Sequence, residues 1–453
     1  MKMINRSKIP APAENISFEI PRINFVNSSD GHEIYFIKKD KLPIVNFNVI
    51  YFCGSKFDPE DKKGLALLTS FLIDEGAGKY DAFQISNEFE KLGTVFSISV
   101  NHDIFSFSIL SLKENFEHSL ELLSTIINEP RLEEKDFIRE KKKLIDKIIQ
   151  LKDEPAYIAS SAFEKQLFKN SYYAFPTIGY ENTVKNIMLD DIKDYYEKYI
   201  QNSKCKFIVT GNINSEEIIN LVDKYFLPEK NFLPDIDLEI PAKSTTKYYI
   251  IHKENSAQGE IRIGHLSRKR NSPDYFANKL MNSILGGEFF SRINLNLREQ
   301  KGITYGAHSS FNYFQNAGYF EINTAVNIEN VAEAITETLS ELEKIKKHIS
   351  REEINLAKSF IIKHFPSNFE SYSQLAQSIL ILLKYNLPLN YYDNYIKNIE
   401  SVSESDIIKA ARENIDLDKL TILVVGDKNK ILQQFTNLSQ EIIELDIYGN
   451  VIE

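Results

Sequence analysis

The sequence predicts an α+β protein built from two homologous domains, each a mainly antiparallel β-sheet packed against long α-helices. Three observations support this fold class. Runs of β-branched and aromatic residues are followed by long amphipathic segments, the same order recurs in the second half, and local matches between the halves keep a nearly constant spacing. At 453 residues the chain is too long for one ordinary hydrophobic core.

The elements of the first half follow from these patterns. Strands are expected where β-branched and aromatic residues partly alternate, at 33–38, 44–52, 94–100, 104–112 and 205–210. Helices are expected where apolar residues recur at helical spacing, at 64–73, 82–92, 116–128, 133–151, 158–168 and 189–199.

The second half repeats this order. Its expected strands are 247–252, 260–265, 304–314, 318–326 and 420–425. Its expected helices are 273–285, 291–300, 328–345 and 352–364, with further helix to about Ala411.

Short matching segments place the two halves about 210 residues apart, which indicates two homologous domains and not a solenoid. Glu90-Lys-Leu-Gly93 is similar to Glu299-Gln-Lys-Gly302, and Phe207-Ile-Val-Thr-Gly211 is similar to Ile422-Leu-Val-Val-Gly426. Phe96 and Tyr305 each lie three residues after the glycine of the first pair. The predicted domains are 1–229 and 246–453, joined by a linker at 230–245 that contains two prolines and little periodicity.

The composition is that of a soluble globular protein, with 43% hydrophobic and 26% charged residues. The net charge of −10 argues against nucleic-acid binding; it suits a basic peptide, although solubility alone explains it. Cys53 and Cys205 lie in apolar runs and are interpreted as buried core residues in a reducing compartment. We see no apolar signal-peptide region at the N-terminus and no membrane span, so a cytoplasmic location is expected.

The sequence contains none of the common catalytic motifs that we sought. No two of its eight histidines are spaced i, i+4 on one helix, and neither His-Glu-x-x-His nor its inverse is present. Gly-x-Ser-x-Gly is also missing, and Gly76-Ala-Gly78 lacks the Lys-Ser/Thr of a phosphate-binding loop. We therefore expect no metal site in this chain.

The order of motifs resembles the pitrilysin and mitochondrial processing peptidase family of zinc metallopeptidases over about residues 20–430. The specific part is ILGGEFFSRINLNLREQKGITYGAHSSF, in which Gly286-Gly287 leads to Ser291-Arg292, then Leu297-Arg298-Glu299 and Tyr305. Gly64-Leu-Ala66, the Glu90–Gly93 segment and the Arg-Glu-Lys at 139–141 are similar to the first half of the family pattern. The resemblance implies that the two domains form a clam-like half of a closed chamber.

The resemblance also implies where the zinc site of an active member would lie. Aligning on Gly64-Leu-Ala66 places the inverted motif His-x-x-Glu-His at Leu67, Ser70 and Phe71, and the third ligand at Lys147. Leucine and phenylalanine have no lone pair for zinc, and an ammonium group repels it. We interpret Leu67 and Phe71 as core residues. Glu140 or Asp146 alone would not replace two imidazoles.

Arg298 and Tyr305 are the residues that the resemblance retains. In the family this pair reaches across the chamber, where the Tyr hydroxyl donates to the oxyanion of the tetrahedral intermediate and the Arg holds a substrate carbonyl. The alternative is structural: an Arg near a helix end that interacts with the terminal carbonyls, and a strand Tyr that fills the core. Asn101, His102 and His308 are interpreted as solvent-facing or capping residues.

Three hypotheses about function remain. The leading one is a non-catalytic subunit of a heterodimeric zinc endopeptidase, which binds a peptide or unfolded polypeptide and supplies Arg298 and Tyr305 to a homologous partner that bears His-x-x-Glu-His and the zinc. The second is a structural scaffold or a peptide-binding homodimer without a peptidase role. The third is an enzyme with an unrelated metal site. The strand 94–100 is the family's peptide-pairing edge, but Ser97-Ile98 replaces its usual Asn-Ala, which puts peptide binding there in doubt.

Overall fold

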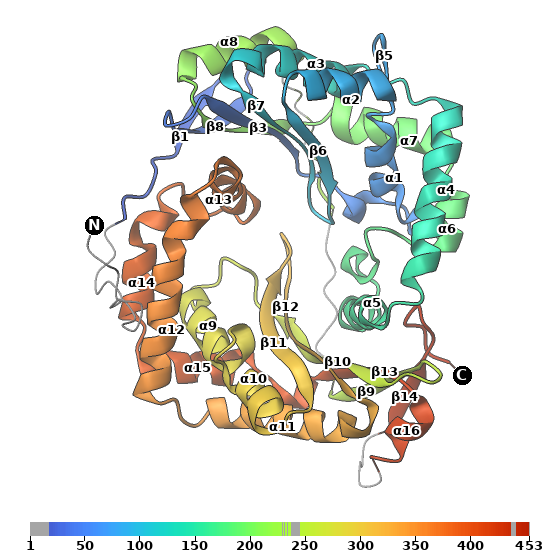
Figure 1. Cartoon of the computed structure of the whole chain (residues 1–453), viewed down its shortest axis with the longest axis vertical. Helices are drawn as coiled ribbons and strands as arrows, with labels where there is room; N and C mark the ends of the chain where they lie inside the picture. The colour runs from blue at the N-terminus through green and yellow to red at the C-terminus, as the bar shows by residue number, and fades with distance from the viewer. Residues whose placement is uncertain are drawn as a thin grey trace, which may run out of the picture.

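The chain forms two sheet-and-helix halves, drawn one above the other in Figure 1. The computed structural model describes residues 18–228, 230, 232, 234–236, 245–435 and 441–452. Most of the predicted linker at 230–245 lies outside the described residues. The predicted α+β class with two sheet-and-helix halves is confirmed.

Each half contains a six-stranded sheet. The strands of the N-terminal sheet are β1 (Asn24–Asn27), β2 (Glu33–Lys38), β3 (Ile44–Tyr51), β6 (Val95–Val100), β7 (Phe105–Leu112) and β8 (Cys205–Gly211). Those of the C-terminal sheet are β9 (Lys247–His252), β10 (Gln258–Ser267), β11 (Thr304–Tyr313), β12 (Gly318–Asn327), β13 (Thr421–Gly426) and β14 (Ile442–Leu445). A separate hairpin joins β4 (Gly76–Ala77) and β5 (Tyr80–Asp81).

The helices cover these sheets. The N-terminal half contains α1 (Leu65–Leu72), α2 (Ala82–Lys91), α3 (Phe116–Asn128), α4 (Glu134–Leu151), α5 (Pro155–Phe168), α6 (Glu181–Asn186), α7 (Leu189–Tyr196) and α8 (Ser215–Tyr225). The C-terminal half contains α9 (Tyr275–Asn282), α10 (Arg292–Asn294), α11 (Val331–Ile345), α12 (Arg351–His364), α13 (Tyr372–Lys384), α14 (Tyr395–Ser401), α15 (Glu404–Asn414) and α16 (Lys428–Leu432). Side-chain caps fix several starts, such as the Ser350–Glu353 capping box of α12.

The two sheets have equivalent strand orders, β2-β8-β3-β7-β6 and β9-β13-β10-β12-β11. In each, the first pair is parallel and the following pairs are antiparallel. Gly93 and Gly302 also match, with φ angles of +62° and +67° at the turn before β6 and β11. The duplication inferred from the sequence is therefore present in the backbone. The halves differ at one edge, where β1 pairs antiparallel with β2 but β14 pairs parallel with β9.

The halves exchange one helix each. The helix α5 packs against β10 and β13 of the C-terminal sheet, and α13 packs against β3 and β8 of the N-terminal sheet (Figure 1). Thr210 on β8 donates a 2.9 Å hydrogen bond to the carbonyl of Tyr372 at the start of α13. Arg262 on β10 donates to the Ala156 carbonyl of α5 at 3.2 Å. The central strands of each sheet are thus buried on both faces, which explains why β8 and β13 are almost continuously apolar.

The tips of the β6–β7 and β11–β12 hairpins meet between the halves (Figure 1). The carboxylate of Asp103, on the first tip, is fully buried and accepts hydrogen bonds from Tyr173 Oη at 2.6 Å and Gln315 N at 2.8 Å. Lys384 Nζ lies 3.3 Å from Asp103 Oδ2, and Lys56 Nζ lies 3.9 Å from Oδ1. We call these five residues the Asp103 network. It joins α13, the N-terminal hairpin and the C-terminal hairpin in one buried ion-pair cluster.

Candidate functional site

The helix α1, where the resemblance places the zinc motif, is held by a buried aspartate that the sequence did not single out. Asp58 Oδ2 accepts from Gly64 N at 2.9 Å and Oδ1 accepts from Ala66 N at 3.0 Å. These N–H groups would otherwise lack partners at the helix start. Burial raises the pKa of Asp58. Gly64 itself has φ +100°, a conformation that favours glycine.

The resemblance assigns the zinc motif to three positions of α1. One of them is a serine that makes a hydrogen bond within the chain, and the other two are apolar residues. Ser70 is buried, and its hydroxyl donates a hydrogen bond to the Leu67 carbonyl at 2.7 Å. The hydroxyl proton is therefore already bonded to a backbone carbonyl of the same helix. Leu67 packs partly buried against the N-terminal core. Phe71 was interpreted as a core residue, but this is wrong because 39% of it is exposed. It lies on the face of α1 that the core does not cover.

The helix α4 supplies no replacement ligand. Lys147 is exposed on this helix. Glu140 accepts from Arg139 Nε at 2.9 Å and from Lys143 Nζ at 2.7 Å, so both cations neutralise it. Asp146 is exposed and belongs to no ligand cluster. In the described part of the chain, no group of three or more His, Cys, Asp or Glu side chains is placed to hold a metal ion.

Arg298 lies on a π-helical turn, Leu295–Gln300, that continues α10. Its guanidinium carbon is 4.5 Å from the centre of the Phe289 ring, and its Nε is 3.5 Å from Glu299 Oε1. The side chain is 37% exposed. Stacking on an exposed phenylalanine restricts the guanidinium while leaving N–H groups open to solvent. The described structure gives Arg298 no hydrogen bond to helix-terminal carbonyls, which was the structural alternative.

Tyr305 projects from the start of β11 and is 91% exposed. The strand is irregular here, with a register shift between Thr304 and Ala307. Thr304 Oγ1 fixes this bulge by donating to the Ala325 carbonyl at 2.8 Å and accepting from Gly306 N at 3.1 Å. A bulge re-aims the side chains of an edge strand. The alternative that Tyr305 fills the core is therefore wrong.

Asn294 positions both members of the pair and was not recognised from the sequence. It is buried, its Nδ2 donates to the Phe289 carbonyl at 2.7 Å, and its Oδ1 accepts from Ala307 N at 3.2 Å. One side chain thus connects the residue under Arg298 to the strand that carries Tyr305. Its only sequence signal is an asparagine inside an apolar helical pattern.

Arg292, part of the Ser-Arg motif, anchors this segment to the rest of the half. Its Nε and Nη2 lie 2.6 Å and 2.8 Å from the two carboxylate oxygens of Glu353 at the start of α12. Burial acts to raise the pKa of Glu353, but the Arg292 and Ser350 hydrogen bonds outweigh it and lower the pKa to about 2. Such a bidentate pair fixes orientation as well as distance.

The other polar candidates have different environments. Asn101 caps its turn, since its Oδ1 accepts from Asp103 N and Ile104 N. His308 is exposed on β11, as expected. His102, expected to be solvent-facing or capping, is instead buried beside the Asp103 network. Its Nε2 lies 2.9 Å from the Phe175 carbonyl, and burial lowers its pKa.

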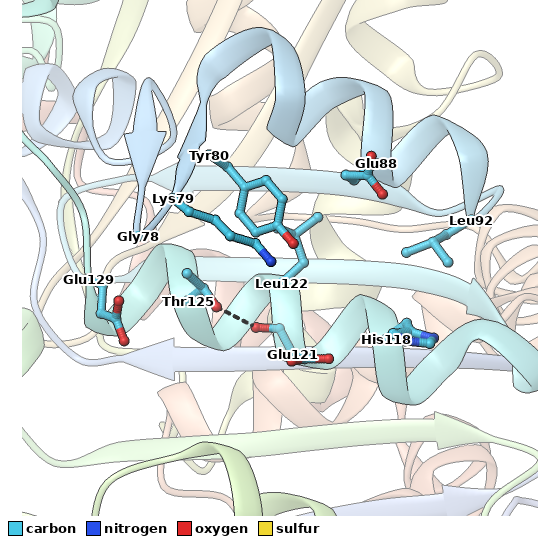
Figure 2. Close-up of a pocket in the computed structure, with 10 residues that line it drawn as sticks. All are labelled: Gly78, Lys79, Tyr80, Glu88, Leu92, His118, Glu121, Leu122, Thr125 and Glu129. Carbon is cyan, nitrogen blue, oxygen red and sulfur yellow. Dashed lines mark hydrogen bonds between the residues drawn. The ribbon is translucent and has the colours of Figure 1, made fainter.

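A cavity of about 530 Å³ lies on the N-terminal half, away from every predicted site residue. Figure 2 shows Tyr80 and Lys79 on one side and the helix α3, with Glu121, Leu122 and Thr125, on the other. The lining mixes charges of both signs and contains no group able to hold a metal ion in the described residues.

Both cysteines are buried and neither forms a disulfide. Burial raises the pKa of Cys53 to about 12, so its thiol stays protonated. None of the helices in the described part of the chain is both long and apolar enough to span a bilayer.

Similar proteins are found across most of the chain. It is 21% identical over 396 residues to "Non-peptidase homolog YmxG" of Helicobacter pylori, covering 86% of this chain and 90% of that protein. It is 25% identical over 311 residues to "Probable inactive metalloprotease YmfF" of Bacillus subtilis, covering 67% and 72%. It is 23% identical over 402 residues to "Zinc protease PqqE" of Helicobacter pylori, covering 87% and 90%.

Solved structures share the fold. The crystal structure of a peptidase M16 inactive domain from Pseudomonas fluorescens has a TM-score of 0.82 at 23% identity, covering 92% of this chain and 99% of that one. A protease from Helicobacter pylori has a TM-score of 0.83 at 22% identity, covering 90% and 100%. Residues 35–179 match the family described as Insulinase (Peptidase family M16), and residues 186–360 match the Peptidase M16 inactive domain. The chain belongs to peptidase family M16.

Proposed function

We propose that this chain is a non-catalytic subunit of a heterodimeric zinc metalloendopeptidase. It binds a peptide or unfolded polypeptide and supplies Arg298 and Tyr305 to the zinc site of a homologous partner that carries His-x-x-Glu-His. The observation that carries the proposal is the 91% exposure of Tyr305 on a bulge that fixes its direction. Within the described residues its hydroxyl has no hydrogen-bond partner, so it is free to act on a group from outside the chain.

The chemistry follows from the two side chains. The Tyr305 hydroxyl donates to the negative charge that develops on the scissile carbonyl oxygen, and Arg298 holds a neighbouring substrate carbonyl in register. Zinc held by the partner would supply an activated water. Asn294 and the Arg292–Glu353 pair position the segment that carries both residues.

The relatives support a pairing of unlike chains. Helicobacter pylori has both a relative named as a non-peptidase homolog and one named as a zinc protease. Bacillus subtilis likewise has one named as a probable inactive metalloprotease and one named as an uncharacterized zinc protease. This chain corresponds to the first member of each pair, because its α1 lacks the zinc ligands. The buried Cys53 thiol suits the reducing cytoplasm, where we place the complex.

Co-expression with an M16 relative from the same organism that bears His-x-x-Glu-His tests this function. Each chain alone should leave an internally quenched peptide intact, and the copurified pair should cleave it. Zinc should be bound at about one ion per pair, all on the partner. Copurification without any gain of cleavage would favour the scaffold alternative. Near-stoichiometric zinc on this chain alone would overturn the proposal and favour an unrelated metal site.

A further inference from the structure

A second cavity, of about 480 Å³, lies in the C-terminal half between α9, α13 and β11. Its volume falls within the range of roughly 300–1,000 Å³ that is usual for small-ligand sites. Most of its wall is aromatic, with Tyr275, Phe311, Tyr313 and Tyr385 among the lining residues. Gln374, also a lining residue, is exposed, so the cavity reaches solvent at that side.

Arg270 and Lys279 are the charged groups at the wall of this cavity, and Arg270 is the more buried of the two, at only 7% exposed. Its guanidinium carbon lies 3.3 Å from the centre of the Tyr275 ring and 5.3 Å from that of Tyr391. One N–H donates to Tyr391 Oη at 3.1 Å. No carboxylate in the described part of the chain pairs with it. A guanidinium has five N–H donors, and in the described part of the chain only one of them has an acceptor.

Arg268, two residues earlier, has the opposite environment. It is 46% exposed, yet Nη1 lies 3.2 Å from Asp274 Oδ2 and Nη2 lies 3.2 Å from Glu413 Oε2. The fold therefore gives two carboxylates to the exposed arginine and none to the buried one. Burying a charge without a counter-ion is unfavourable, so an unpaired buried arginine that borders a cavity indicates that its counter-ion comes from outside.

The aromatic rings do not replace that counter-ion. They stabilise the flat face of the guanidinium, but among the described residues only the N–H that donates to Tyr391 Oη has an acceptor in the guanidinium plane. Two wall hydroxyls are already used inside the protein: Tyr385 Oη donates to the Tyr313 carbonyl and Tyr392 Oη to the Ser378 carbonyl, both at 2.9 Å. These tyrosines hold the wall in place through backbone carbonyls.

We propose that this cavity binds a carboxylate carried on an apolar or aromatic stem, with the free N–H groups of Arg270 on the carboxylate and the aromatic wall around the stem. Planar guanidinium groups match the two oxygens of a carboxylate. The carboxylate belongs either to the C-terminal residue of a polypeptide or to a free aromatic acid. The site depends on this chain alone, so it stands whether or not Arg298 and Tyr305 complete a partner's site.

Fluorescence anisotropy with the purified full chain tests the site. The probe is a six-residue neutral peptide that ends in phenylalanine, labelled at its amino end, in two forms: the free C-terminal acid and the C-terminal amide. The free acid should bind at least ten times more tightly than the amide. Competition with N-acetylphenylalanine separates the two sources: full displacement at a similar concentration indicates that a free acid suffices, and weak displacement indicates a polypeptide end.

Variants of Arg270 and Arg268 test which side chain produces the preference for the free acid. Arg270→Gln should remove the preference for the acid, Arg270→Lys should retain part of it, and Arg268→Gln should retain all of it. Unchanged circular dichroism serves as the folding control. The proposal is overturned if neither peptide nor the free acid binds, if the wild type binds acid and amide equally, or if folded Arg270→Gln keeps the preference. The acid-to-amide comparison needs no variant, so it holds even if Arg270→Gln does not fold.

Discussion

The strand that follows the Gly93 turn in the N-terminal half carries Phe96, whose ring stacks on Phe89 at 4.9 Å. The strand that follows the equivalent Gly302 turn in the C-terminal half carries Tyr305, which is 91% exposed. The two turns share one backbone conformation. The duplicated fold therefore uses the same position for internal packing in one half and leaves it free for an external group in the other.

The polar groups of the two halves also differ in what they contact. In the N-terminal half, the hydroxyl of Ser70 and the carboxylate of Glu140 are used by neighbouring groups of the chain. In the C-terminal half, buried Asn294 and the Arg292–Glu353 pair hold the segment of Arg298 in place. Under the proposed function, the N-terminal half contributes structure and the C-terminal half contributes the contact with a partner.

The largest expected loss of stability comes from the Asp103 network, which joins the halves. Asp103→Asn removes the charge that faces Lys56 and Lys384, whose side chains are 5% and 16% exposed. We expect the free energy of unfolding to fall by about 3–5 kcal/mol, measured by urea denaturation. Glu88→Gln is the control, because its pair with Lys91 is exposed and should contribute less than about 0.5 kcal/mol. Equal losses for both variants would mean that the halves do not depend on this cluster.

A smaller, pH-dependent effect is expected at Glu353. Its pKa is lowered from 4.5 to about 2 in the folded chain, so its contribution is complete above pH 4.5 and is lost as the pH falls through about 2. Glu353→Gln should therefore lower the free energy of unfolding by about 1–2 kcal/mol at pH 7, after allowance for solvent screening. The difference from wild type should shrink toward pH 2. The exposed neighbour Glu352 provides the control, and a pH-independent difference would contradict this reading.

The smallest expected loss of stability comes from substitutions at Gly93 and Gly302, and it should be similar at the two turns. Gly93→Ala and Gly302→Ala each place a side chain at positive φ, and nothing lies within 4 Å of either added carbon. Each should cost about 1 kcal/mol of unfolding free energy, because only backbone strain is introduced. In the complex with the zinc-bearing partner, only Gly302→Ala should slow peptide cleavage, since it alters the turn before Tyr305. Slower cleavage by Gly93→Ala alone would reverse the roles that we assign to the halves.

The sequence predicted the regular elements well where their pattern is strong. The helix α3 was predicted at its observed bounds because its apolar residues recur at regular helical spacing. The strand β14, with only four residues, was missed, because its identity depends on pairing with β9. The exchange of α5 and α13 was also not predicted, since it depends on contacts between residues far apart in the chain.

The site was predictable only in part. The interpretation that Leu67, Ser70 and Phe71 replace zinc ligands depends on the alignment that the resemblance implies, and it stays a prediction. The exposure of Phe71 was missed, because an apolar residue on a helix gives no sign of which face the core covers. The bulge before Ala307 and the bridging role of Asn294 depend on three-dimensional contacts that leave no distinct pattern in the sequence.

Peptide cleavage by the reconstituted complex with Tyr305→Phe tests the central claim most directly. The substitution removes one hydroxyl from an exposed side chain, so the melting temperature should not change. Tyr80→Phe is the control, because it removes the hydroxyl of a partly buried tyrosine in the N-terminal half, among the residues that line the cavity there (Figure 2). We predict that kcat falls by about 100- to 1,000-fold for Tyr305→Phe and is unchanged for the control. Cleavage at the wild-type rate by the Tyr305→Phe complex would contradict the proposal that this chain completes the site of its partner.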